Sequence, residues 1–98
     1  MIMVRDVFQL KFGKAKDAKA LWKEGKVLRE KYGQQSLRAL VDLTGSYYTF
    51  VMESMYENLS AFEKSLRETM SMPEFGQWYQ KFVPLVESGH REIYTIVD

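Results

Sequence analysis

The stretch IMVRDVFQLKFGKAKD, residues 2–17, changes its hydrophobic period at Gly13. Before this glycine, apolar and polar side chains alternate, as in a β-strand with one face in a core. From residue 15 to residue 32, apolar side chains recur at steps of three and four residues, which is typical of a helix, and Gly33 is expected to end it. The stretch therefore predicts a strand that leads through Gly13 into a helix.

Alternation returns over residues 37–43 and again over residues 48–56, with Thr44-Gly45-Ser46 between the two segments. Short alternating runs joined by a glycine-containing turn predict a β-hairpin. Residues 91–97 alternate as well, and they predict a last strand.

Two copies of the pattern S-x-x-E, Ser60–Glu63 and Ser71–Glu74, stand before apolar helical patterns. This capping box is a sequence signature of a helix N-terminus, so we expect one helix to begin at each. Pro73 fits the first turn of the second of these helices, and Pro84 is expected to end it near residue 83.

In chain order the predicted elements are βαββααβ, which is the order of a ferredoxin-like plait. Right-handed crossovers place all the helices on one face of an antiparallel sheet. The chain has 98 residues, which is the size of a single α+β domain, so we expect one domain over residues 1–98.

The two faces of the predicted sheet differ in composition. One face is strongly apolar and is expected to meet the helices: Val4, Phe8, Leu10, Val41, Phe50, Met52 and Ile96. The other face mixes aliphatic and charged side chains: Val7, Leu40, Val51, Ile93, Arg5, Arg38, Asp42, Glu53 and Arg91. Because a fully solvated face is more polar than this, we expect a homodimer in which a second copy covers the open face. The alternative is a monomer with a partly apolar open face.

The composition excludes several classes of function. The 14 basic and 13 acidic residues give a net charge of +1, which offers no overall attraction to nucleic acid or to anionic lipid. Cysteine is absent, which excludes disulfides and thiolate metal sites and favours a cytoplasmic location. No apolar run approaches the roughly 20 residues of a membrane helix. We therefore expect no metal, cofactor, nucleic-acid or membrane partner.

The strand–glycine–helix opening over residues 2–17, together with the plait and the chain length, resembles the dimeric α/β-barrel superfamily. This superfamily includes the NIPSNAP-like proteins and the small antibiotic-biosynthesis and haem-degrading monooxygenases. The resemblance covers nearly the whole chain. It implies a dimeric α/β barrel with a ligand cavity between the sheet and the helices.

In the cofactor-independent monooxygenases of this superfamily, an Asn on the first strand, a Trp and a His form the catalytic set. The resemblance places Asp6 at the Asn position, Ser65 or Leu66 at the Trp position, and Tyr79 at the His position. None of these is the residue type that the family uses. The resemblance thus supports the architecture and a pocket, and it weakens the case for the family's activity.

The segment MPEFGQWYQKF, residues 72–82, carries four aromatic side chains at helical spacing: Phe75, Trp78, Tyr79 and Phe82. Aromatic residues at this spacing usually pack in a core. The alternative is that Phe75, Trp78 and Tyr79, with Trp22 of the first helix, line a pocket for a flat ligand. We expect the aromatics to be mainly core, with Trp78 or Tyr79 bordering a cavity that Asp6 also reaches.

Asp6 and His90 are the candidate catalytic residues. Asp6 lies on the apolar face of the first strand, where a buried carboxylate must be paired, hydrogen-bonded or protonated. It either reaches water at the strand end or acts as an acid or polar anchor in a pocket. His90 is the only histidine; it is either a plain loop residue or a general base, since imidazole titrates near neutral pH.

Two classes of function remain open. The first is a small-molecule site for a flat, mostly apolar ligand, where oxygenation or isomerisation without a tightly held cofactor is the chemistry that the resemblance implies. The second is a non-catalytic structural or interaction module of the same fold. An RNA-recognition domain shares the order of elements, but it stacks bases on the open sheet face, and Tyr48 and Phe50 fall on the other face.

Overall fold

The computed structural model describes residues 1–31 and 37–98 of the chain. The elements follow the predicted order: β1 (Ile2–Leu10), α1 (Ala15–Lys31), β2 (Arg38–Val41), β3 (Thr49–Tyr56), α2 (Leu59–Met70), α3 (Pro73–Phe82), the 3₁₀ turn η1 (Val83–Leu85) and β4 (Val86–Thr95). Gly33, which the sequence predicts as the end of the first helix, lies outside the described residues. In the part of the chain that is described, no helix has the length and apolar character needed to span a membrane.

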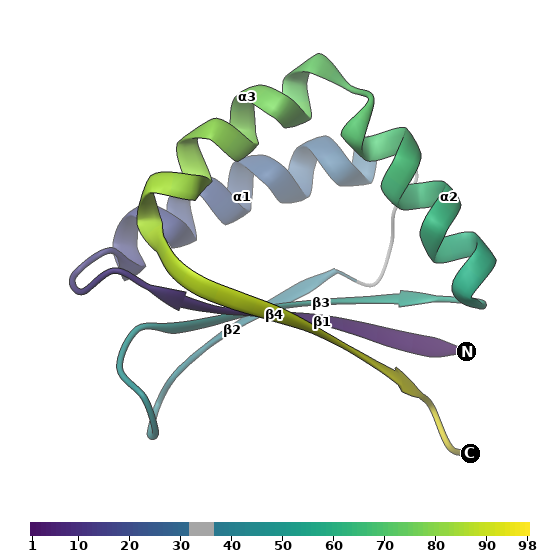
Figure 1. Cartoon of the computed structure of the whole chain (residues 1–98), viewed down its shortest axis with the longest axis horizontal. Coiled ribbons are helices and arrows are strands. Elements are labelled where there is room, and N and C mark those ends of the chain that lie inside the picture. The colour runs from purple at the N-terminus through teal and green to yellow at the C-terminus, as the bar shows by residue number, and fades with distance from the viewer. Residues whose placement is uncertain (32–36) are drawn as a thin grey trace.

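The strands form one antiparallel sheet in the order β2-β3-β1-β4. All three helices lie on one face of this sheet: α1 and α3 run side by side, and α2 rises from the end of β3 to the start of α3 (Figure 1). The predicted ferredoxin-like plait is therefore confirmed. Among residues 1–31 and 37–98, no helix covers the opposite face of the sheet.

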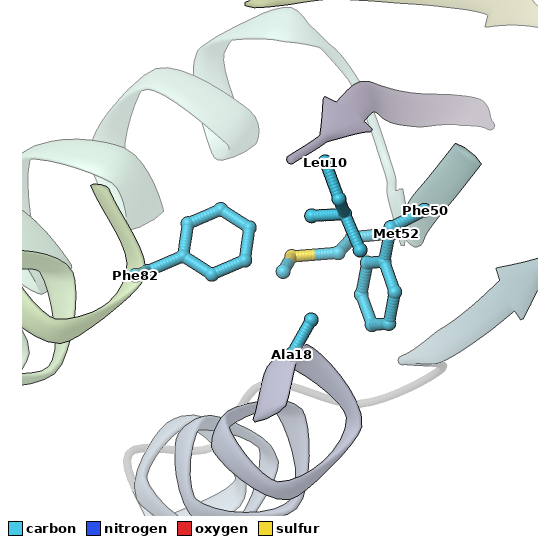
Figure 2. Close-up of a cluster of buried hydrophobic side chains, with 5 residues drawn as sticks. All are labelled: Leu10, Ala18, Phe50, Met52 and Phe82. Carbon is cyan, nitrogen blue, oxygen red and sulfur yellow. The ribbon is translucent and has the colours of Figure 1, made fainter. Parts of the chain in front are cut away.

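The core lies where β1, β3, α1 and α3 meet. Five buried side chains from these elements form it: Leu10, Ala18, Phe50, Met52 and Phe82 (Figure 2). Phe8 of β1 extends this cluster, because its ring packs edge-on against the Phe82 ring with centroids 5.0 Å apart. The core thus joins the start of α1 and the end of α3 to the middle of the sheet.

β1 has the predicted alternation, but it ends at Leu10 and does not include Phe12. Val4 and Leu10 face the helices and are almost fully buried, whereas Phe12 is 78% exposed. Gly13 adopts a φ of +84°, which is the left-handed conformation that glycine favours, and the chain turns away from the sheet there. The Phe12 ring packs instead against Tyr48, with centroids 4.6 Å apart.

The two predicted capping boxes are wrong. α2 begins at Leu59, and Asn58 is its N-cap residue, since Asn58 Oδ1 accepts a hydrogen bond from the Ala61 N–H at 2.9 Å. Ser71 ends α2 instead of opening α3, and its hydroxyl donates to the Glu68 carbonyl oxygen at 2.7 Å. Asparagine caps a helix as well as serine does, so Asn58 can serve as the cap in place of Ser60.

α3 begins with Pro73 in its first turn and ends at Phe82, as the sequence predicts. Its N-cap residue is Met72, which makes no side-chain capping bond. Pro84 lies in η1, where its missing N–H cannot continue the helical hydrogen bonds, and the chain passes from there directly into β4.

β4 is longer than predicted and begins at Val86 instead of residue 91. Gly89 and His90 therefore belong to a strand and not to a loop. Gly89 lies opposite Phe8 of β1, where an added Cβ atom would come within 2.7 Å of the phenyl ring. A larger residue at position 89 would clash with the Phe8 ring, which accounts for the glycine. Because glycine has no side chain, the alternation of apolar and polar residues cannot be recognised at the start of this strand.

The predicted faces of the last strand are also wrong. The register of β4 with β1 places Arg91 opposite Asp6 and Ile93 opposite Val4. Arg91 and Ile93 therefore face the helices and do not belong to the open face. Apolar residues occupy both faces of this strand, so its hydrophobic pattern alone could not fix the register.

Candidate functional site

A cavity of about 130 Å³ lies between the sheet and the helices and is partly open to solvent. All three helices, together with β1, β3 and β4, contribute to its mainly apolar lining. Five of the six site residues predicted from the sequence line this cavity: Asp6, Trp22, Phe75, Trp78 and Tyr79. The structure thus brings these five residues together, and what they bind or catalyse stays a prediction.

Trp78 is the centre of an aromatic wall on α3. Its indole stacks on Phe82 with ring centroids 5.1 Å apart and on Phe75 with centroids 5.7 Å apart. Tyr79 stacks on Phe75 at 6.1 Å and is 53% exposed, whereas Phe82 is buried. The aromatic segment therefore has both of the roles considered from the sequence: one end fills the core, and the other borders the cavity.

Trp78 is held in place by α1. Its Nε1–H donates a hydrogen bond to the Leu21 carbonyl oxygen at 2.6 Å. Gly25, one turn further along α1, leaves room for the indole, because an added Cβ atom would lie 2.8 Å from Trp78 Nε1. Gly25 also lines the cavity. Sequence reasoning did not find this role, although a glycine inside a helical pattern is a signal of close packing.

An ion pair forms the polar part of the cavity. Arg91 Nε donates a hydrogen bond to Asp6 Oδ1 at 2.6 Å. The guanidinium carbon of Arg91 lies 5.2 Å from the centroid of the Phe62 ring, which is a cation–π contact. The carboxylate that the sequence places on an apolar face therefore has a charged partner, and that partner is the arginine whose face was predicted wrongly.

Three charged side chains line the cavity: Asp6, Arg29 and Arg91. The sequence did not point to either arginine. Arg29 lies in the basic helical pattern of α1, which is typical of a solvated face, and Arg91 was placed on the wrong face of its strand.

His90 does not reach the cavity. It precedes Arg91 in β4, and neighbouring side chains of a strand point to opposite faces, so His90 lies on the open face opposite Val7. Its Nε2 is 3.0 Å from Glu92 Oε2. The pKa of the Glu92 carboxyl is lowered mainly by its hydrogen bond with His90 and, to a smaller extent, by its hydrogen bond with Tyr94. The same bond to Glu92 raises the pKa of the Tyr94 hydroxyl. The structure therefore does not bring Asp6 and His90 into one site.

The positions that the superfamily resemblance pointed to do converge. Asp6, Ser65, Leu66 and Tyr79 all line the cavity, although none is the Asn, Trp or His of the monooxygenase set. Among residues 1–31 and 37–98, no group of three His, Cys, Asp or Glu side chains could hold a metal ion. The lining offers aromatic rings, the Asp6–Arg91 pair, Arg29 and a few hydroxyl groups.

Comparisons with known proteins agree with this architecture. The family model described as NIPSNAP matches residues 5–98. No curated protein matches the chain. An uncharacterized NIPSNAP domain protein from Burkholderia xenovorans is 13% identical, with a TM-score of 0.88 over 99% of this chain and 95% of that chain. A NIPSNAP family protein from Agrobacterium tumefaciens is 15% identical, with a TM-score of 0.88 over 99% of this chain and 93% of that chain.

A crystal structure of an antibiotic biosynthesis monooxygenase is similar as well. It is 13% identical, with a TM-score of 0.77, and the match covers 100% of both chains. At such identities the structural likeness shows a common fold.

Proposed function

Because the chain belongs to the NIPSNAP family and encloses an apolar cavity with one ion pair, we propose that it binds a flat, mostly apolar small molecule. The observation that carries this proposal is the aromatic wall around Trp78, which borders the same cavity as the Asp6–Arg91 pair. Ligand sites typically combine an apolar lining with a few polar groups that orient the ligand. The wall would bury the ring system, and the ion pair would orient it.

The volume of the cavity suits an aromatic ring. An engineered apolar cavity of about 150 Å³ binds benzene, so a cavity of about 130 Å³ is close to the size of one ring. The opening to solvent gives a second ring space to extend. A fused two-ring compound is therefore a suitable probe.

Oxygenation or isomerisation without a cofactor is a second candidate function, favoured by the position of Asp6 in the cavity. Asp6 Oδ1 accepts from Arg91, which leaves the other carboxylate oxygen to accept a proton from an acidic group of a substrate. Consumption of dissolved oxygen in the presence of a bound phenol would show oxygenation, and formation of an isomer without loss of oxygen would show isomerisation. Either result would separate this candidate from binding alone.

A cytoplasmic location remains a prediction from the cysteine-free composition.

We expect the neutral probe 2-naphthamide to bind with a Kd of about 0.1–1 mM or tighter, measured by isothermal titration calorimetry. Replacing Ser65 with phenylalanine places a ring in the cavity, and it should weaken binding at least about tenfold. The matched control is Lys64→Phe, which adds the same ring at an exposed neighbouring position of α2 and should leave the affinity unchanged.

Absence of binding to the wild-type protein, or equal affinities for wild type and a folded Ser65→Phe variant, would contradict a ligand site in this cavity. The non-catalytic structural module would then be the better description. Circular dichroism of each variant confirms that the fold is intact.

We also propose that the chain forms a homodimer through the open face of the sheet. The register places Val7, Val51 and Leu40 side by side across β1, β3 and β2. The adjacent row holds Arg5 of β1, Glu53 of β3 and Arg38 of β2. This combination of an apolar row and a charge-paired row favours a second copy of the sheet as the covering surface.

The charged row is already neutralised in part within one chain. Glu53 is 7% exposed and lies 3.0 Å from Arg5 Nε and 2.5 Å from Arg38 Nε. A carboxylate with two arginines can be covered by a partner at a lower desolvation cost than an unpaired charge. Leu40 is 40% exposed in the single chain and is the most exposed residue of the apolar row Val7, Val51 and Leu40.

Light scattering should therefore give twice the chain mass of 11.5 kDa at micromolar concentration. The substitution Leu40→Asp should weaken the dimer about 100-fold or more, because it buries an unpaired charge. The matched control is Leu59→Asp. Leu59 is an exposed leucine in the first turn of α2, on the other side of the sheet, so this substitution should not change the mass. A wild-type monomer, or a Leu40→Asp dimer of unchanged affinity, would count against this interface.

A further inference from the structure

Arg91 uses only part of its hydrogen-bonding capacity within the chain. Its Nε donates to Asp6 Oδ1 at 2.6 Å, and its guanidinium packs against the Phe62 ring. Among the residues that the structure describes, its two Nη nitrogens make no hydrogen bond. A guanidinium carries five N–H donors in a planar fork, so most of the donors of Arg91 remain for another acceptor.

The contacts that Arg91 does make fix its position. Asp6 binds the Nε edge, and Phe62 contacts the guanidinium group. An arginine held on two sides loses less conformational entropy when it binds an acceptor than a free side chain does. Asp6 is therefore a positioning residue for Arg91 in this arrangement.

The acceptor that suits such a fork is a carboxylate. Arginine and carboxylate groups match in planar geometry and form charge-assisted hydrogen bonds. The rest of the lining is mainly apolar and aromatic, so the molecule that carries the carboxylate must be a flat, apolar one.

We propose that the ligand of this cavity is an aromatic carboxylic acid, with its carboxylate on the Nη groups of Arg91 and its ring against the Trp78 wall. This inference rests on the proposed function and narrows it to one chemical class. The Asp6 charge lies near this carboxylate and opposes it, so the hydrogen bonds and charge of Arg91 must outweigh that repulsion.

The test compares 2-naphthoate with 2-naphthamide, two probes of the same shape that differ in charge. Titration calorimetry at pH 7.5 should show that 2-naphthoate binds about 10- to 100-fold more tightly than 2-naphthamide, because a hydrogen bond to a charged group is stronger. Asp6→Asn keeps an oxygen that can accept from Arg91 Nε and removes the opposing charge. This variant should bind 2-naphthoate about 3- to 10-fold more tightly still.

Arg91→Gln should abolish the preference for 2-naphthoate over 2-naphthamide. This variant also leaves Asp6 without its partner, so the double variant Asp6→Asn/Arg91→Gln is needed. It replaces the ion pair by two neutral amide side chains and keeps the net charge of the lining. If Arg91 receives the carboxylate, the double variant also lacks the preference.

Recovery of the preference in the double variant would overturn the inference, because the loss in Arg91→Gln would then come from repulsion by the unpaired Asp6. Equal affinities of the wild-type protein for the two probes would overturn it as well, and would leave the proposed binding site standing. If neither probe binds, the proposed function fails together with the inference.

Discussion

Replacing Trp78 with alanine is expected to lower the free energy of unfolding by about 3–5 kcal/mol. The indole stacks on Phe75 and on the buried Phe82, and its N–H bonds to the Leu21 carbonyl oxygen. Truncation removes both stacking contacts and the hydrogen bond from the indole N–H. Chemical denaturation followed by circular dichroism gives the change in free energy.

The control for this substitution is Tyr79→Ala, the neighbouring aromatic residue of α3. Because Tyr79 is 53% exposed and stacks only on Phe75, its loss should cost about 1 kcal/mol. A cost for Trp78→Ala no larger than that for Tyr79→Ala would mean that Trp78 does not join the helices to the core.

Adding one methyl group at Gly25 is expected to destabilise the protein by about 1–3 kcal/mol. In an exposed helix a Gly→Ala change is stabilising by up to about 1 kcal/mol, so the expected sign is reversed here. The reason is the indole of Trp78, since the new Cβ atom of Gly25→Ala would lie 2.8 Å from Nε1 and 2.9 Å from Cε2. The hydrogen bond to Leu21 would have to break or lengthen.

Gly76→Ala provides the matched control, because Gly76 is also helical and an added Cβ atom meets nothing within 4 Å. This substitution should be neutral or stabilising by up to about 1 kcal/mol. If Gly25→Ala stabilised the protein to the same extent, the close approach of α1 to Trp78 would be contradicted. In a Trp78→Phe background the cost of Gly25→Ala should shrink, because the smaller ring leaves space.

The architecture could be predicted from the sequence because each of its main hydrophobic patterns indicates one type of secondary structure. The alternation of β1 over a buried face, the helical period that follows Gly13, and the hairpin between residues 37 and 56 are each local signals. Together they allow few topologies, because crossovers are right-handed and helices must cover an apolar face. Asp6 stood out for the same reason: a charged residue interrupts an apolar face whose register is otherwise unambiguous.

The register of the last strand could not be predicted from the local sequence pattern. Arg91 and Ile93 face the helices, and His90 faces the opposite side, which is the reverse of the predicted arrangement. Gly89 has no side chain to show its face, and apolar residues follow on both faces. The register depends on the contact between Gly89 and the Phe8 ring, which is a long-range contact that no local pattern contains.

The polar part of the cavity was hidden for the same reason. Arg91 pairs with Asp6 across two strands that lie at opposite ends of the chain, and only the sheet register places them together. The aromatic wall was easier to find, because Phe75, Trp78 and Tyr79 lie on one helix and their spacing is visible in the sequence. Gly25 could have been found only by asking why a helix should contain a glycine at that point.

The most direct measurement of the central claim uses the two tryptophans. The chain contains two, Trp22 and Trp78, and both line the cavity. Their indole N–H groups give two separate signals in a ¹H–¹⁵N correlation spectrum, and a single substitution assigns them. Titration with 2-naphthoate should shift both indole signals along one saturable binding curve, while amides of the open face, such as those of Leu40 and Val51, stay in place. Unmoved indole signals at probe concentrations that saturate binding, or shifts confined to the open face, would contradict a ligand site between the sheet and the helices.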